Sequence, residues 1–130
     1  MPSIVGTWKL AHATARDAAG VALPAPYAGK GIGRVTFTVE GRMMSVVCDG
    51  RQQLPAGTPR EYSSYCGNYT FDGSRLVTGV DAASDPSRIG SDQVRGVRFE
   101  DGRMILSPPP RGTGETAEYR EITWERIAAE

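Results

Sequence analysis

The sequence predicts an all-β fold, an eight-stranded antiparallel up-and-down β-barrel that forms one domain over residues 1–130. Three segments alternate apolar and polar residues around an acidic residue followed by glycine. They predict hairpins with tight turns at residues 40–41, 72–73 and 101–102. No long stretch has the 3.6-residue period of a helix. Tight turns alternate with long connections along the chain, so the three turns are expected at one end of the barrel and the long loops around its mouth.

The first strand is expected over residues 4–15. Lys9 belongs on the outer face, so the even-numbered Trp8, Leu10 and His12 are expected to point inward. Residues 16–30 contain several glycines and prolines and are expected to form a long connection.

The next two strands form the hairpin of residues 35–46. With a two-residue loop at residues 40–41, Phe37 opposes Met44 and Val35 opposes Val46. Directly opposed residues share a face of the sheet. The apolar set Val35, Phe37, Met44 and Val46 is therefore expected inside the barrel, together with Cys48.

The remaining hairpins are placed in the same way. The turn at residues 72–73 pairs Tyr65 with Val80, and the turn at residues 101–102 pairs Phe99 with Met104 and Val97 with Leu106. The last strand is expected over residues 116–127. The side chains expected inside from these strands are Tyr65, Tyr69, Leu76, Thr78, Val80, Gln93, Arg95, Val97, Phe99, Met104, Leu106, Ile122, Trp124 and Arg126.

Composition excludes several classes of function. Fifteen Lys and Arg residues balance fifteen Asp and Glu residues, so the net charge predicts no nucleic-acid partner and no binding to an anionic membrane. No stretch approaches the roughly 18 apolar residues of a membrane span. The first residues lack the features of a signal peptide, so a cytoplasmic location is expected, in which Cys48 and Cys66 are free thiols on opposite faces. The sequence does not determine the oligomeric state, and a homodimer is one of the open alternatives.

Short motifs carry a resemblance to a known family. Gly6-Thr7-Trp8 resembles the Gly-x-Trp signature of lipocalins, and Arg126 resembles the arginine that packs on that tryptophan in lipocalins. The chain is similar to the bacterial and fungal lipocalin-like domain family, a calycin-type barrel. The other matching segments are residues 5–10, 41–43, 65–69, 92–95, 106–109 and 123–126. The resemblance implies a barrel with an internal cavity, but no particular reaction.

Three polar residues are expected to converge near the mouth, His12, Tyr65 and Arg95, and they are the catalytic candidates. His12 can act as a base or bind a ligand, although a single histidine on a strand is more often structural or partly exposed. Inside the barrel Arg95 would need a carboxylate, such as Glu118 or Asp92, or a polar ligand; a flipped register would expose it instead. One histidine and scattered carboxylates predict no metal site, and no cofactor is expected. The expected ligand-binding residues are Trp8, Leu10, Phe37, Met44, Val46, Tyr69, Thr78, Gln93, Val97, Phe99, Leu106 and Trp124.

Three functional hypotheses remain. The first is a protein that binds a small, partly hydrophobic molecule in the barrel cavity. The second is a cofactor-free isomerase, cyclase or dehydratase that acts there on a natural-product intermediate, with mainly shape and one or two hydrogen-bond donors as its catalytic means. The third is a packed barrel without a cavity that serves as an interaction module.

Overall fold

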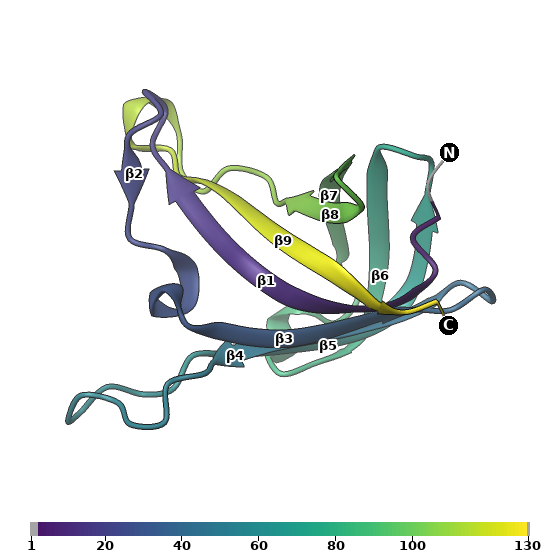
Figure 1. Ribbon diagram of the computed structural model, residues 1–130, viewed down its shortest axis with the longest axis horizontal. Helices are drawn as coiled ribbons and strands as arrows, with labels where there is room; N and C mark the ends of the chain where they lie inside the picture. The colour runs from purple at the N-terminus through teal and green to yellow at the C-terminus, as the bar shows by residue number, and fades with distance from the viewer. Residues whose placement is uncertain (1–2, 130) are drawn as a thin grey trace.

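The computed structural model describes residues 3–129 and is the expected all-β barrel (Figure 1). One sheet has the strand order β2-β1-β3-β4-β5-β6-β7-β8-β9, and β1 also pairs with β9. This second pairing closes eight antiparallel strands into an up-and-down barrel, and β2 is a short addition to β1. The strands are β1 (Gly6–Arg16), β2 (Ala22–Leu23), β3 (Gly31–Phe37), β4 (Arg42–Asp49), β5 (Tyr62–Phe71), β6 (Arg75–Ala83), β7 (Asp92–Glu100), β8 (Arg103–Ser107) and β9 (Tyr119–Ala128).

Two ends of the barrel differ in their connections. The three hairpin turns lie at one end, here called the closed end, where β1 also begins and β9 ends (Figure 1). The long connections surround the other, open end and contain the 3₁₀ turns η1 (Pro26–Gly29), η2 (Pro86–Arg88) and η3 (Gly114–Thr116). None of the helical turns in the described residues has the length and apolar character that crossing a membrane requires.

The hairpin between β7 and β8 has the expected register. Phe99 pairs with Met104 and Val97 with Leu106. The two loop residues, Asp101 and Gly102, have φ angles of 52° and 77°, as a type I′ turn requires. The predicted register is confirmed. It could be predicted because an Asp-Gly pair favours the type I′ turn that fits the twist of the strands.

The hairpin between β5 and β6 is shifted by two positions from the expected register. Its loop consists of residues 73–74, because Asp72 accepts hydrogen bonds from the backbone N–H groups of Ser74 and Arg75 and the Asp72 N–H bonds to the Arg75 carbonyl. A shift of two keeps every side chain on its face. Leu76, Thr78 and Val80 are therefore buried as expected.

The hairpin between β3 and β4 is shifted by one position, and here the expectation is wrong. Its loop has three residues, 39–41, with Gly41 at a φ of 94°, so Phe37 pairs with Met43. A shift of one reverses the faces of β4. Met44 and Val46 lie on the outer face, 59% and 40% exposed. The side chains that point inward from β4 are Met43, Ser45 and Val47.

Two further residues, His12 and Cys48, lie on the opposite face of the sheet from the one expected. A β-bulge between Leu10 and His12 shifts the pairing of β1 with β9. Trp8 and Leu10 remain buried, but His12 is exposed on the outer face. Cys48 pairs with the exposed Ile32 and so lies on the outer face rather than inside.

Both cysteines are free thiols in the structure. The Cys66 thiol lies on the outer face near Asp81, with 3.4 Å between the sulfur and Oδ1. Burial of the thiol and this hydrogen bond to a carboxylate both raise the pKa of Cys66.

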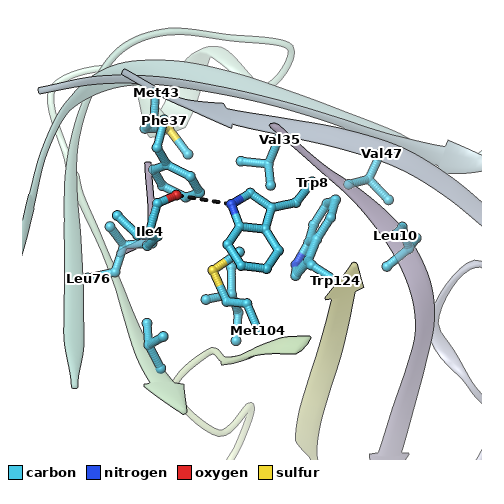
Figure 2. Packing of buried hydrophobic residues seen from close by; sticks show 12 residues of the cluster. Ile4, Trp8, Leu10, Val35, Phe37, Met43, Val47, Leu76, Met104 and Trp124 are labelled. Carbon is cyan, nitrogen blue, oxygen red and sulfur yellow. Dashed lines mark hydrogen bonds between the residues drawn. The ribbon is translucent and has the colours of Figure 1, made fainter. Parts of the chain in front are cut away.

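The closed end is filled by an apolar core around Trp8, which is 1% exposed (Figure 2). Its indole Nε1 donates to the Ile4 carbonyl oxygen at 3.0 Å, and the Arg126 guanidinium lies 4.2 Å from the ring centroid. Arg126 also donates to the backbone oxygens of Val5 and Ser3. At Gly6, with a φ of 129°, a Cβ would lie 2.5 Å from a backbone oxygen of β9, so only glycine fits. The predicted contact of Trp8 with Arg126 is confirmed.

Candidate functional site

A cavity of about 100 Å³ lies at the open end of the barrel. Its floor is apolar, formed where the core ends by Val35, Met43 and Trp124. Its upper wall is polar, because several arginine, tyrosine and serine side chains reach it from the strand ends and from the long loops. The complete lining is Tyr27, Val35, Met43, Ser45, Val47, Ser63, Tyr65, Arg88, Arg95, Leu106, Pro108, Arg111, Arg120, Ile122 and Trp124.

Arg95 on β7 lines the cavity, as expected from the sequence. Its guanidinium donates to the Val94 carbonyl oxygen and to Oε1 of Gln93, both at 2.8 Å. Gln93 is therefore the expected neighbour of Arg95. The two carboxylates that the sequence offered as partners are not used: Glu118 pairs with Arg120 instead, and no ion pair joins Arg95 to Asp92 in the described residues.

Tyr65 on β5 also lines the cavity, as expected. Arg88 from η2 lies over its ring, with 5.5 Å between the guanidinium carbon and the ring centroid. Arg88 also donates to Oγ of Ser63 at 3.3 Å. The contacts of Arg88 therefore tie the loop that carries η2 to the inner face of β5.

Tyr27 is a wall residue that the sequence did not indicate. It lies in η1 with a φ of 56°, and the following Ala28 has a φ of 54°, a conformation that is uncommon for residues other than glycine. Burial of its hydroxyl and the nearby negative charge of Glu61 raise the pKa of Tyr27. Two successive residues in this region turn the loop so that the Tyr27 ring covers one side of the cavity.

The loop of residues 50–61 at the mouth is held by a buried carboxylate. Asp49 is 1% exposed and accepts from the Arg51 guanidinium, with 2.6 Å between Oδ2 and Nη2. Arg60 closes the loop by donating to the backbone oxygens of Asp49 and Arg51. The hydrogen bonds from Arg51 hold the pKa of Asp49 below its usual value.

The structure separates the sequence-derived site residues into groups. Tyr65, Arg95, Leu106 and Trp124 line the cavity, and Gln93 supports Arg95. His12, Met44 and Val46 are on the outer face, so their expected inward placement is wrong. Met44 and Val46 line shallow depressions on the outside of β3, β4 and β5. The others belong to the core or pack on it below the cavity: Trp8, Leu10, Phe37, Tyr69, Thr78, Val97 and Phe99.

Sequence reasoning missed two kinds of cavity residue. Met43, Ser45 and Val47 were missed through the one-residue shift of the β3–β4 hairpin. Arg88 and Arg111 lie in long connections, where no alternating pattern indicates a direction for the side chain. The described residues contain no cluster of His, Cys, Asp and Glu side chains that could hold a metal ion.

Comparison with protein families finds a match over residues 5–127, to the family described as lipocalin-like domain. The match covers nearly the whole chain and includes the Gly6-Thr7-Trp8 motif and Arg126. Neither the curated proteins nor the solved structures contain a match to this chain.

Proposed function

Since this chain belongs to the lipocalin-like domain family, whose barrels are generally suited to small hydrophobic ligands, we propose that it binds a small, partly hydrophobic molecule at the open end of the barrel. The observation that carries the proposal is the cavity, which combines an apolar floor with a polar upper wall. Ligand sites usually have this combination, because apolar surface supplies affinity and a few polar groups set orientation.

The size of the cavity limits what enters it. Its volume is about 100 Å³, whereas sites for drug-sized ligands have roughly 300–1,000 Å³. An apolar cavity of about 150 Å³ holds a benzene molecule. We therefore expect one ring or a short aliphatic chain to enter between Val35, Met43 and Trp124, with the rest of the ligand among the mouth loops.

Binding is favoured over the enzymatic alternative by the position of His12. A cofactor-free isomerase, cyclase or dehydratase at this site would gain from a side chain that takes a proton from the substrate or gives one to it, and histidine is the side chain most often used. His12 lies on the other side of the sheet, and Tyr65 lines the cavity without a histidine or a carboxylate among the described lining residues. The cytoplasmic location expected from the sequence belongs to the same proposal, and cell fractionation tests it.

The test uses two adjacent valines that point to opposite faces of β4. Val47→Phe fills the cavity from the inside, and Val46→Phe places the same extra volume on the outer face. Benzamide and hexanamide are the probes, titrated into ¹⁵N-labelled protein, because ligands of this size are expected to bind with a Kd on the order of 1 mM. The backbone amides of Val35 and Ile122 and the indole N–H of Trp124 should shift in the unmodified protein.

We expect Val47→Phe to weaken probe binding about tenfold or more and Val46→Phe to leave it unchanged. Overpacking costs roughly 1–3 kcal/mol, so circular dichroism must first show that Val47→Phe is folded. Shifts confined to the outer face, or a loss of binding in Val46→Phe alone, would place the probes in the depression beside Met44 and contradict the proposal.

A further inference from the structure

Four arginines surround the cavity, although the chain as a whole has no net charge. Arg88 comes from η2, Arg95 from β7, Arg111 from the connection after β8, and Arg120 from β9. No carboxylate is among the residues that line the cavity in the described structure. The residues that line the cavity therefore carry an excess of positive charge, although the whole chain is balanced.

Only one of the four arginines has a carboxylate partner. Arg120 pairs with Glu118. Within the described residues, no ion pair is formed by Arg88, Arg95 or Arg111, and the side-chain partners of Arg88 and Arg95 are neutral. By contrast, Arg42, Arg98 and Arg103 on the outer face each pair with a carboxylate.

Arg95 is the most enclosed of the unpaired arginines. Burial lowers the pKa of its guanidinium, and the positive charges of Arg88 and Arg111 lower this pKa further, whereas Tyr65 acts in the opposite direction. Arg95 is half-buried; partial burial of a charge without a counter-charge has a cost, and the neighbouring cations add to it. A negative charge beside Arg95 would offset the cost of its burial and the repulsion from Arg88 and Arg111.

Trp124 is the aromatic residue of the cavity floor, and it carries a buried donor. It is 2% exposed and lines the cavity, and its indole nitrogen is buried with no hydrogen-bond partner in the described residues. Guanidinium and indole N–H groups donate hydrogen bonds and do not accept them. A ligand that offers acceptor atoms would therefore suit the guanidinium groups of the cavity wall.

We propose that the ligand of this cavity is an amphipathic organic anion, whose negatively charged group accepts hydrogen bonds from Arg95 between Arg88 and Arg111. The apolar part of the ligand lies on the floor of the cavity, between Val35, Met43 and Trp124. This inference rests on the proposed binding function and adds the charge of the ligand to it. The planar guanidinium fits a carboxylate or a phosphate ester, and the probes distinguish these two.

The experiment compares probes that match in shape and differ in charge. Benzoate and benzamide form one pair, hexanoate and hexanamide the other, and phenyl phosphate tests the phosphate ester. In the unmodified protein we expect each carboxylate to bind about 10-fold to 100-fold more tightly than its amide, which is roughly 1.4–2.8 kcal/mol at 1.4 kcal/mol per factor of ten. Tighter binding of phenyl phosphate than of benzoate would identify a phosphate ester as the better fit.

Arg95→Met should reduce the preference for the carboxylate to about one. Arg98→Met is the matched control, because Arg98 lies on the outer face of the same strand and pairs with Glu121, so this variant should keep the preference. Benzamide and benzoate binding equally well to the unmodified protein would overturn the anionic ligand and leave the proposed binding function standing. If none of the probes binds, both proposals fail. The comparison in the unmodified protein needs no variant, so it decides the question even if Arg95→Met does not fold.

Discussion

The two ends of the barrel use the same side-chain types in opposite ways. At the closed end, the indole nitrogen of Trp8 bonds to Ile4 and the guanidinium of Arg126 bonds to backbone oxygens and covers the Trp8 ring. At the open end, Trp124 is buried and Arg95 is half-buried, but the indole nitrogen of Trp124 has no partner and Arg95 has no counter-charge in the described residues. The difference indicates that the tryptophan and arginine of the closed end serve stability, whereas the charge of Arg95 at the open end contributes nothing comparable to the fold.

The largest effect is expected at the closed end, for Trp8→Ala. Removal of a fully buried tryptophan leaves a cavity in the core, so the free energy of unfolding should fall by about 3–5 kcal/mol. Chemical denaturation, followed by far-UV circular dichroism, measures the change. A denaturation midpoint close to that of the unmodified protein would show that the core around Trp8 does not carry the stability assigned to it.

A matched pair of substitutions sharpens the comparison between the ends. Arg126→Met removes the cation over Trp8 and two hydrogen bonds to backbone oxygens, so it should cost about 1–2 kcal/mol of stability. Arg95→Met removes an enclosed charge without a counter-charge, and its melting temperature should equal or exceed that of the unmodified protein. Equal losses of stability in the two variants would contradict the division of roles between the ends.

The smallest effect concerns the pH dependence of the loop at the open end. The folded-state pKa of Asp49 is lowered by Arg51, so Asp49 contributes stability above the unfolded-state pKa of about 3.9, and this contribution is lost as the pH falls through the folded-state pKa. Asp49→Asn should therefore lower the melting temperature at pH 7 and reduce its further fall on acidification to pH 2.5. Asp101→Asn, in an exposed turn that retains its geometry with asparagine, is the control and should follow the unmodified protein. Parallel curves for all three proteins would contradict the assignment.

Part of the candidate site could be predicted from the sequence. Arg95 and Leu106 were placed correctly, because the turn at residues 101–102 has an unambiguous type and the strand alternation extends from it. Tyr65 was also placed correctly, since it alternates along β5 with Gly67 and Tyr69, although a register irregularity between Cys66 and Gly67 pairs it with Ala83 rather than with Val80. Trp124 followed from the alternation of the last strand.

The sequence pattern of β4 has two solutions. Residues 43–47 read Met-Met-Ser-Val-Val, so either register buries one methionine and one valine. Local alternation cannot choose between them. The three-residue loop with Gly41 at positive φ decides, and it turns Met43, Ser45 and Val47 inward.

The sequence by itself determined the barrel, its closed end and the strand faces next to unambiguous turns. These features depend on local periodicity, on turn residues and on motifs such as Gly6-Thr7-Trp8, where the absence of a Cβ at Gly6 is a property of one position. Only the tertiary structure decided that His12 is outside and that Arg88 and Arg111 join Arg95 around the cavity. A single-residue bulge reverses a face at small local cost, and a loop side chain takes its direction from the strands on which it packs. Both outcomes depend on contacts between segments distant in the chain, which local sequence patterns do not record.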